Sequence, residues 1–407
     1  MKERLSEEKV FKDPVHNYIY VDHPLIWELI NTREFQRLRR IRQLGGSFYT
    51  FHGAEHSRFS HSLGVYEITR KIISQFERNR YEDWPREERL VCLCAALLHD
   101  LGHGPFSHSV ESVFEVQHEE WSQRIILEDT EVNRVLSRVS PHFPRDVADV
   151  ISKSYRKPIA VSLISSQMDA DRMDYLLRDA YFTGVNYGAF DLERILRMMR
   201  PYKGNIVIKE SGMHAVEHYL MSRSQMYWQI YFHPVTRSAE IILRKIFQRA
   251  KWLFEQGHPF RFMLHPLPEL FMKTLKVDDF LMLDDSFMQT AMMQWTFDSD
   301  TVLSDLCSRF MHRRLFKYEP IGSPEDPLVA ARRDALLTAG LDPHYYMEVD
   351  YPTDNFYDVY RPGESSEKTP ILLLTELDEV VEISERSDIV RSISGPHQGV
   401  HHLYYPM

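Results

Sequence analysis

The sequence has 407 residues, of which 43% are hydrophobic, and a formal net charge of −10, so it can build a large core in one or two domains. Its acidic balance excludes a protein that holds free duplex DNA mainly by charge, and we do not expect nucleic acid as the main partner. The charged start has no apolar signal segment and no run of about 18 apolar residues exists, so we expect a cytoplasmic protein without a membrane partner. Three cysteines (Cys92, Cys94 and Cys307) allow no disulfide framework.

A turn, a strand and an arginine-rich helix are predicted first. Asp13-Pro14 marks the turn, and the β-rich residues 18–21 predict a short strand. Helices are expected from Pro24 to Ile30 and again after Asn31-Thr32, where apolar residues recur at helical spacing. Five arginines share the other faces of this second helix: Arg33, Arg37, Arg39, Arg40 and Arg42. They fit either a solvated face or a phosphate-binding face at a subunit interface.

The stretch from Leu97 to His108 carries the strongest chemical signal. An apolar run over 90–98 ends abruptly in His99-Asp100, and two more histidines follow among glycines and a proline. We expect the run to be a buried helix that delivers His99 and Asp100 to the floor of a pocket. Imidazole and carboxylate are the usual ligands of a hydrolytic divalent metal, so this stretch predicts a metal site.

Helices are predicted on both sides of this stretch. Upstream, His61 stands in the first turn of a helix expected to continue to about residue 78. Downstream, Pro105 occupies the favoured first position of a helix that carries His108 and Glu111. A further helix is expected to start at His118.

Four residues can be combined into one metal site. His61, His99 and Asp100 are joined by Asp171, which lies in an aspartate-rich helix predicted over 168–179. Two imidazoles and two carboxylates form a mixed nitrogen and oxygen site that leaves positions open for water and substrate. We predict one divalent ion (Mn²⁺, Mg²⁺, Fe²⁺ or Zn²⁺), which would activate water and polarise a phosphoryl oxygen.

Three further histidines exceed the number of ligands that one ion needs. His103, His108 and His118 are interpreted as donors behind the ligands, as phosphate contacts or as a general acid for the leaving oxygen. Arg58 and Arg172 can neutralise phosphate charge through bidentate contacts.

The rest of the chain is predicted to be mainly helical. Helices are expected over 131–183, 213–256 with a break near Pro234, and 266–310, and a strand over 205–211 forms a hairpin with the residues before it. Residues 319–327 are the best linker candidate. After it we expect a helix over 328–339, a mobile loop over 352–370, and three β-rich segments, 345–349, 371–375 and 380–384.

Six motifs follow one another along residues 9–235. They are Asp13-Pro14-Val15-His16, Phe35-Gln-Arg-Leu-Arg39, Gln43-Leu-Gly-Gly46, Arg58-Phe-Ser-His61-Ser-Leu-Gly-Val65, His99-Asp-Leu-Gly-His-Gly-Pro-Phe-Ser-His108 and Asp169-Ala-Asp-Arg-Met-Asp-Tyr175. With these motifs the chain resembles the HD-domain metal-dependent phosphohydrolases, and more narrowly the deoxynucleoside triphosphate (dNTP) triphosphohydrolases. The resemblance implies a mainly α fold. It places an HD-domain helical core, small β-hairpins and effector-binding elements in residues 1–320, and a smaller α+β portion in residues 321–407.

The resemblance also implies a reaction and an assembly. Water would attack the α-phosphorus of a dNTP and release deoxynucleoside and intact triphosphate, and a nucleotide effector would activate a homotetramer. His61, His99, Asp100 and Asp171 would hold the metal. The implied catalytic residues are His103, His108, Glu111 and His118. The implied substrate contacts are Gln43, Leu44, Arg58, Arg172, Tyr175, Asp179, Arg223 and Tyr231. The implied effector contacts are Lys9, Val10, Gln36, Arg39, Arg194, Arg313 and Lys317.

Four positions depart from the pattern of the family's animal enzyme. Asn31 stands where that enzyme has an acidic residue that selects guanine, and Lys12 stands where it has asparagine. Arg172 replaces a lysine and Tyr227 replaces a histidine. The catalytic set is kept, whereas the identity of the effector does not carry over.

Two alternatives stay open. A different HD hydrolase, acting on cyclic nucleotides, alarmones or nucleic-acid ends, would use the same metal ligands. The alarmone enzymes have an acidic pair soon after their His-Asp, and residues 102–105 are Gly-His-Gly-Pro instead, which disfavours that substrate. A non-catalytic nucleotide sensor or single-strand-binding protein would keep the fold, and the intact ligand set disfavours it. The physiological metal, the preferred dNTP and the role of residues 321–407 are not fixed by the sequence.

Overall fold

The computed structural model describes residues 4–115, 117–351, 370–394 and 399–406, and for residues 107–109 it describes the backbone without the side chains. Helices make up 56% of the structure and strands 11%, which confirms the predicted mainly α fold. The loop predicted over 352–370 lies, except for its last residue, outside the described part of the chain.

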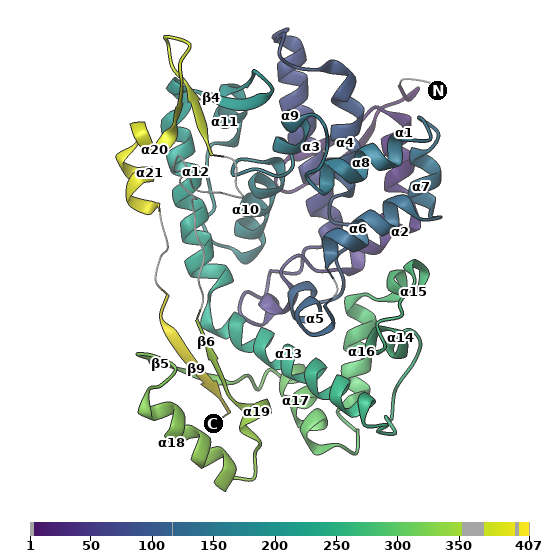
Figure 1. The fold of residues 1–407 in the computed structure, drawn as a ribbon, viewed down its shortest axis with the longest axis vertical. Helices are drawn as coiled ribbons and strands as arrows, with labels where there is room; N and C mark the ends of the chain where they lie inside the picture. Colours follow the sequence, from purple (N-terminus) through teal and green to yellow (C-terminus); the bar gives the residue numbers. More distant parts are fainter. Residues whose placement is uncertain (1–3, 116, 352–369, 395–398, 407) are drawn as a thin grey trace.

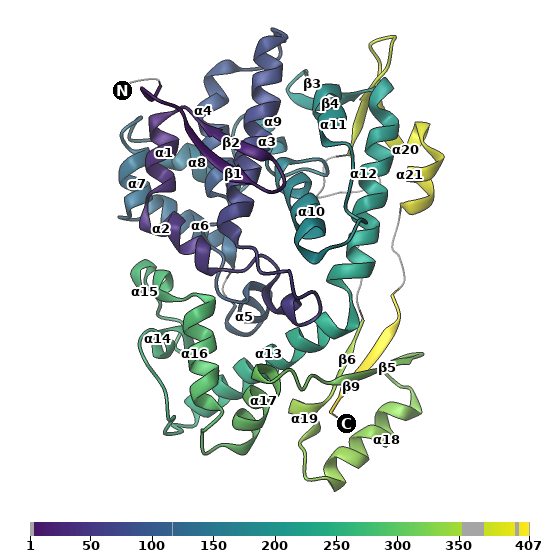
Figure 2. The same cartoon turned by 180° about the vertical axis from the view of Figure 1, so that it is seen from behind.

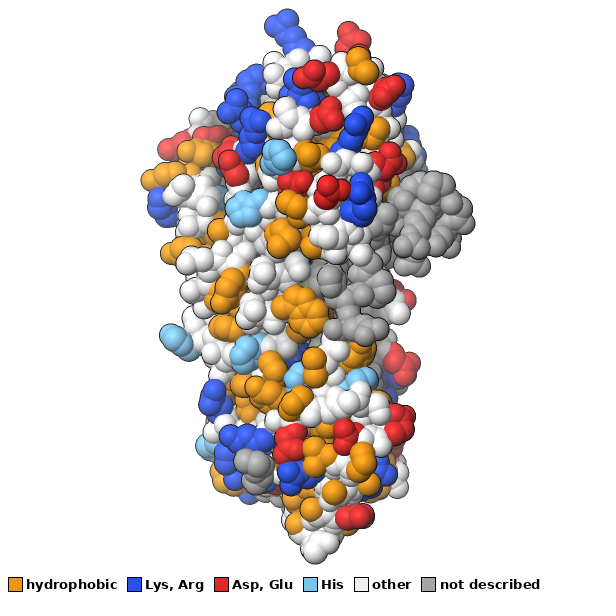
Figure 3. Space-filling model, turned by 90° about the vertical axis from the view of Figure 1, so that its left-hand side faces the viewer, with side chains coloured by type: hydrophobic (Ala, Val, Ile, Leu, Met, Phe, Trp, Pro, Cys, Tyr) orange, Lys and Arg blue, Asp and Glu red, His pale blue; other side chains and the backbone are white. Residues whose placement is uncertain are grey.

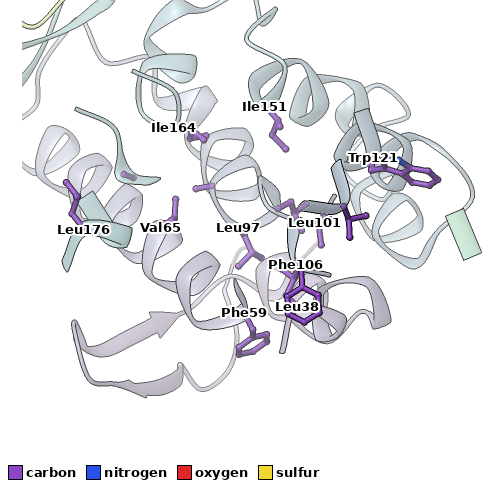
Figure 4. Close-up of a cluster of buried hydrophobic side chains, with 14 of the residues drawn as sticks. Leu38, Phe59, Val65, Leu97, Leu101, Phe106, Trp121, Ile151, Ile164 and Leu176 are labelled. Atoms are coloured by element: carbon purple, nitrogen blue, oxygen red, sulfur yellow. The ribbon is translucent and has the colours of Figure 1, made fainter. Parts of the chain in front are cut away.

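A bundle of helices forms the core (Figure 1). Its central members are α3 (Arg58–Arg78), α4 (Arg89–Leu98), α6 (His118–Leu127), α8 (Phe143–Ile151) and α10 (Ala170–Thr183). Helix α4 packs against α3 and α8, while α10 lies against α3 and α6 against α8. Every residue of α4 from Val91 to Leu98 is buried, as expected for a helix that is apolar on all sides. Figure 4 shows Leu97 and Leu101 in the hydrophobic cluster to which Val65 and Trp121 also belong.

The remaining helices lie outside this bundle. Helices α1 (Pro24–Ile30), α2 (Arg33–Arg37) and α7 (Glu131–Leu136) pack together on its outer side. The other short helices are α5 (Ser107–Phe114), α9 (Pro158–Ser162), α11 (Leu192–Met198), α14 (Leu267–Phe271), α15 (Val277–Met282), α16 (Asp285–Trp295), α17 (Thr301–Met311), α18 (Pro327–Thr338), α19 (Pro343–Tyr346), α20 (Ile383–Arg386) and α21 (Asp388–Ile393).

Two long helices pass along one side of the bundle and beneath it (Figure 2). Helix α12 (Met213–Met226) continues into a π-helical turn over Tyr227–Tyr231, and α13 (Pro234–Glu255) follows. The predicted break near Pro234 is confirmed, because proline begins the second helix where no backbone donor is needed. A π-helical turn is often found at a functional site, and here it supplies two tyrosines to the pocket described below.

Three small sheets complete the fold. Strands β1 (Lys9–Asp13) and β2 (Asn17–Val21) form a hairpin, with Val10 opposite Tyr20. The second sheet has the order β3-β4-β7-β8, made of Met199–Tyr202, Asn205–Lys209, Leu372–Leu374 and Val380–Glu382. The third has the order β5-β9-β6, made of Lys317–Ile321, His401–Tyr405 and Glu348–Asp350. The β4–β7 pair is parallel and the other pairs are antiparallel.

Several predicted boundaries are wrong. Helix α3 begins at Arg58 instead of His61, and residues 9–13 form a strand where none was expected. Helix α5 begins at Ser107 instead of Pro105, because Phe106 adopts a left-handed conformation (φ 48°) that interrupts the helix. The linker predicted over 319–327 is shorter, since β5 extends to residue 321. The division of the chain near residue 320 stays a prediction, and strands that follow it complete two sheets that begin before it.

The surface is uneven. On the face turned to the viewer in Figure 3, charged side chains gather toward the two ends, while hydrophobic side chains and histidines lie between them. Within the described residues, no helix is both long enough and apolar enough to cross a bilayer.

Candidate active site

The four predicted metal ligands meet at one point. His61 comes from α3, His99 and Asp100 follow α4, and Asp171 lies in the first turn of α10. His61 Nε2 is 3.0 Å from Asp171 Oδ1 and 3.8 Å from Asp100 Oδ2. His99 Nε2 is 3.3 Å from Asp100 Oδ1 and 3.7 Å from Asp171 Oδ1.

Both imidazoles are held with Nε2 toward this point. The Nδ1 of His99 lies 2.9 Å from the carbonyl oxygen of Ala96, and the Nδ1 of His61 lies 2.8 Å from Asp174 Oδ2. When Nδ1 donates its proton to an oxygen, the lone pair of Nε2 is left free to bind a metal. The sequence of α4 therefore positions His99, since the same helix provides both the apolar anchor and the carbonyl acceptor.

The residues present fit a divalent cation. The ligand atoms of His61, His99 and Asp171 all lie within 4.8 Å of one another. Among the described residues, the buried Nε2 of His99 has no hydrogen-bond partner, so a polar atom faces the cluster unsatisfied. Burial favours the neutral form of His61, but hydrogen bonds with Asp171 and Asp174 outweigh it and raise the pKa of His61 to about 10. This concentration of negative charge is what a cation would neutralise.

A second layer of groups holds His61 from behind. Asp174 is fully buried and its carboxylate receives His16 Nε2 at 2.6 Å, His61 Nδ1 at 2.8 Å and Arg178 Nε at 2.8 Å. Despite its burial, Arg178 and the two histidines hold the pKa of Asp174 well below its usual range. These supporting residues were not predicted to have a role. The motif Asp13-Pro14-Val15-His16 was the available signal, since both Asp13, which binds Arg178, and His16 belong to it.

A second histidine pair lies beside the metal ligands. His103 Nε2 is 3.3 Å from Asp100 Oδ1, and its ring stacks on that of His118 with centroids 4.0 Å apart. Glu111 Oε1 lies 3.2 Å from His118 Nδ1 and 3.6 Å from His103 Nδ1. The side chain of His108 lies outside the described residues.

The environments of the two stacked histidines shift their pKa values in opposite directions. Burial and the charge of Arg58 hold the pKa of His103 well below its ordinary value. Burial acts on His118 in the same direction, but its contact with Glu111 outweighs it and raises the pKa of His118. A neighbouring pair with one proton acceptor and one proton donor is suited to general acid–base work.

The metal ligands and the stacked histidines open into one pocket of 490 Å³, within the usual range of about 300–1,000 Å³ for small-molecule sites. The four metal ligands, His103 and His118 line it. So do seven of the predicted substrate contacts: Gln43, Leu44, Arg58, Arg172, Tyr175, Asp179 and Tyr231. Arg223, the eighth, does not line the pocket; it lies behind the wall, with its guanidinium carbon 5.6 Å from the centroid of the Tyr227 ring.

Arginine side chains place positive groups beside the carboxylates of the pocket. Arg58 NH1 donates to Asp100 Oδ2 at 2.8 Å, and Arg172 pairs with the buried Asp169. Within the described part of the chain, the buried Nε atoms of Arg58, Arg172 and Arg223 have no hydrogen-bond partner. Arg58 and Arg172, which line the pocket, can therefore offer guanidinium donors to an anion of more than one charge, whereas Arg223 stands behind them.

A rigid group of side chains forms another part of the wall. Tyr231 donates to Asp179 Oδ2 at 2.8 Å, and His56 Nε2 lies 2.8 Å from Asp179 Oδ1. The rings of Tyr175 and Tyr231 pack edge to face at 6.2 Å. His56 was not predicted as a site residue, because its sequence surroundings gave no sign of this contact.

Other lining residues had no predicted contact. These include Lys153, Glu119, Tyr227, Thr236 and Glu240. Lys153 stands in a loop between α8 and α9, its side chain is exposed, and no described carboxylate lies within ion-pair distance of it. Each comes from a loop or helix whose local pattern is ordinary, so only the tertiary arrangement reveals it.

The predicted effector residues lie outside the pocket lining. Gln36 and Arg39 contact each other, with Arg39 Nε donating to Gln36 Oε1 at 2.8 Å. The others are spread over separate elements: Lys9 and Val10 on β1, Arg194 on α11, Arg313 after α17 and Lys317 at the start of β5. Their effector role stays a prediction.

One arginine contradicts the expected arrangement of the arginine-rich helix. Arg37 does not share an outer face with its neighbours; it is buried, with 1% of its surface exposed. Its guanidinium donates to main-chain carbonyl groups inside the molecule, which is the reason that it points inward. By contrast, Arg33 and Arg40 have half-exposed side chains, which pair with the exposed Asp278 and the buried Asp284 respectively.

The chain matches two protein-family models and several known relatives. The HD domain matches residues 58–179, and the HD associated region matches residues 190–259. The uncharacterized protein YwfO of Bacillus subtilis (strain 168) is 57% identical over 404 residues, which cover 99% of this chain and 93% of that protein. The deoxynucleoside triphosphate triphosphohydrolase SAMHD1 of Danio rerio is 30% identical over 281 residues, which cover 60% of this chain and 45% of that enzyme.

Two solved structures are similar to this chain over nearly its whole length. A phosphohydrolase from Bacteroides thetaiotaomicron VPI-5482 superposes with a TM-score of 0.85 at 28% identity and covers 98% of this chain and 100% of its own. A hypothetical protein from Aquifex aeolicus superposes with a TM-score of 0.77 at 29% identity. The matched HD domain begins at Arg58 and ends at Asp179, so it contains all four converging ligands. The chain belongs to the family of HD-domain phosphohydrolases that includes the dNTP triphosphohydrolases.

Proposed function

We propose that the protein is a metal-dependent dNTP triphosphohydrolase, which converts a dNTP and water into deoxynucleoside and triphosphate. One observation carries the proposal: a single pocket joins the four converging metal ligands to arginine donors and to a wall of packed tyrosines. A hydrolytic metal site alone would fit any phosphoester. The arginines suit a polyphosphate, and the tyrosine wall suits a sugar next to it.

His61, His99, Asp100 and Asp171 would hold the divalent ion, which when bound supplies Lewis-acid activation of water and of a phosphoryl oxygen. Arg58 and Arg172 would bind phosphate oxygens, since both line the pocket and retain unused donors. Their charges offset the charge of the triphosphate and orient its α-phosphorus toward the metal ligands.

The stacked histidines would handle the proton of the leaving group. As water oxygen bonds to the α-phosphorus, the bond from that phosphorus to O5′ breaks, and O5′ must gain a proton to leave as a hydroxyl group. His118, whose pKa is raised by Glu111, would be the chain's proton donor at this side of the pocket, and the neighbouring His103 would be the proton acceptor. His108 is the remaining candidate for this step.

Sugar selection would rest on the tyrosine wall. Tyr175 and Tyr231 are fixed by their mutual packing, and Asp179 fixes Tyr231 through its hydroxyl group. A wall of this kind would reject an additional 2′-hydroxyl group through lack of space rather than through a specific contact. Activation by a nucleotide effector and assembly into a homotetramer belong to the same proposal and rest on the resemblance alone.

A product assay tests the reaction. Purified protein is incubated with each dNTP and, separately, each ribonucleotide, with Mg²⁺ or Mn²⁺ and a panel of activating nucleotides, in water enriched in ¹⁸O. We expect free deoxynucleoside and tripolyphosphate, with the label in the tripolyphosphate, and little turnover of ribonucleotides. The double variant His99→Ala with Asp100→Ala should be inactive. Release of pyrophosphate or orthophosphate, or label in the nucleoside, would contradict the proposal and favour a different HD hydrolase.

A further inference from the structure

Arg37 is a charged side chain buried without a charged partner. Only 1% of its surface is exposed, and among the described residues no carboxylate lies within 4.0 Å of its guanidinium. Desolvation is strong enough to lower the pKa of this arginine to about 10, although Asp284 and Asp285 stand nearby. Burying an arginine in this way costs free energy, and a hydrophobic residue of similar size would fill the same space. Packing alone therefore does not explain why an arginine occupies this buried position.

The contacts of Arg37 join two distant segments. NH1 donates to the carbonyl oxygen of His103 at 2.9 Å. Nε and NH2 donate to the carbonyl oxygen of Leu283 at 3.0 and 2.7 Å. The guanidinium carbon lies 4.6 Å from the centroid of the Phe280 ring. One side chain thus ties α2 and the end of α15 to the backbone of a residue that lines the pocket.

The loop that carries His103 has a second tether at Phe106, three residues later. Oδ1 of the buried Asp285 accepts the backbone N–H of Phe106 at 3.2 Å, and its Oδ2 accepts the backbone N–H of Arg42 at 3.0 Å. Phe106 has a positive φ of 48°, which a residue other than glycine rarely adopts unless its surroundings impose it. The segment from His99 to Phe106, which we call the catalytic loop, is therefore fixed at His103 by Arg37 and at Phe106 by Asp285.

We propose that Arg37 is a positioning residue for His103. By holding the carbonyl oxygen of His103, it fixes the backbone from which the imidazole reaches Asp100 on one side and His118 on the other. The inference rests on the proposed function for the catalytic part of its test. A displacement of about 1 Å at such a residue costs up to about a hundredfold in rate, whereas substrate affinity is set elsewhere in the pocket.

The test separates positioning from general stability. Arg37→Met removes the donors and keeps the bulk, and Arg37→Lys keeps a buried donor. Arg249→Met is the control, because Arg249 is a partly buried arginine in a bidentate pair with Asp300 and does not line the pocket. For each variant we measure kcat and KM for a dNTP, metal content, thermal midpoint, and hydrogen exchange of the peptide covering residues 99–106.

We expect Arg37→Met to lower kcat by about ten- to a hundredfold with KM and metal content nearly unchanged. Exchange in the catalytic loop should rise, and Arg37→Lys should recover part of both losses. Arg249→Met should lower the thermal midpoint without these effects. If Arg37→Met does not fold, Asp285→Ala removes the second tether and should produce the same rise in exchange and fall in kcat.

Two results would overturn the inference. One is unchanged kcat and loop exchange in Arg37→Met, or in Asp285→Ala if the first variant does not fold. The other is a change in kcat and loop exchange in Arg249→Met that equals the change in Arg37→Met, when the two variants lose the same stability. If the wild-type protein does not hydrolyse dNTPs, the proposed function fails, whereas the exchange measurement still decides whether Arg37 fixes the catalytic loop.

Discussion

His16 Nε2 lies 2.6 Å from one oxygen of Asp174, while the other oxygen of that carboxylate lies 2.8 Å from His61 Nδ1. The β1–β2 hairpin is thereby tied to a predicted metal ligand through one buried carboxylate. A group that orients a ligating histidine raises its basicity and fixes its tautomer, so its loss weakens metal binding without touching the metal.

We therefore predict that His16→Ala weakens the affinity for Mn²⁺ by about ten- to a hundredfold. A calorimetric titration of the metal-free protein with Mn²⁺ measures the affinity. His52→Ala is the control, because His52 is exposed and does not line the pocket. Equal affinities in His16→Ala and the wild type would show that the hairpin does not support the site.

Gly64 is required by the close approach of α3 to Asp174. A Cβ at this position would lie 1.8 Å from Asp174 Oδ1 and 2.5 Å from Arg178 NH2, and neither group can move without losing its buried partners. We expect Gly64→Ala to lower the free energy of unfolding by at least about 3 kcal/mol.

Gly104→Ala provides the comparison for Gly64. The nearest atom to its Cβ is Phe280 Cε2 at 3.8 Å, an ordinary contact, so the expected loss is below about 1 kcal/mol. Urea unfolding of both variants and the wild type measures the difference. Similar losses in the two variants would contradict the steric explanation.

The buried carboxyl of Asp285 predicts a pH dependence of stability. Desolvation raises its pKa to about 6, against the opposing effects of the Arg42 and Phe106 backbone donors and of the Arg42 and Arg58 charges. The unfolded chain releases this proton near pH 4 and the folded chain near pH 6. The contribution of the group is therefore fully present below about pH 4 and is lost as the pH rises through 6.

Asp285→Asn should remove this dependence, because an amide does not ionise. Relative to the wild type, the variant should gain up to about 3 kcal/mol in free energy of unfolding between pH 4 and pH 6.5, whatever its offset at pH 4. Urea unfolding of both proteins at several pH values measures the difference curve. A difference curve that is flat over this range, or falls, would show that the pKa of the Asp285 carboxyl is not raised in the folded protein.

Lys153 is the exposed cation at the edge of the pocket. Because no described carboxylate pairs with it, its charge is available to a polyphosphate, and we expect Lys153→Ala to raise KM for a dNTP about three- to tenfold with kcat retained. Lys157→Ala, four residues along the chain and outside the pocket lining, should change neither parameter. The effect should shrink with added salt, because exposed charges are screened. A loss of kcat at constant KM would assign Lys153 to another step.

Parts of the site were predictable because their signals are local. The apolar run before His99 predicts a buried helix whose end must carry that histidine and Asp100 together. The motif Asp169–Tyr175 likewise lies in α10, where Asp169 caps the first turn by accepting the N–H of Arg172. Periodicity and capping are encoded within a few residues, so they can be read before the fold is known.

Other parts depend on contacts between distant segments. Arg37 has the same sequence surroundings as the surface arginines beside it, and only the position of Leu283 and the His103 carbonyl turns it inward. The parallel pairing of Ile208 with Leu373 joins residues that no local pattern relates. Such pairs are decided by which surfaces are left to be buried after the helices have formed.

The third sheet sets an order of events during synthesis. Strand β9 lies between β5 and β6 and pairs Leu403 with both Glu319 and Val349. The two outer strands are translated first, but each depends on a centre strand that leaves the ribosome later. Until residues 401–405 emerge, both strands expose unpaired edges, which are sites for mispairing with other chains. A ribosome stalled before these codons would therefore hold a nascent chain with unpaired strand edges to which chaperones can bind, even if its helical bundle had already folded.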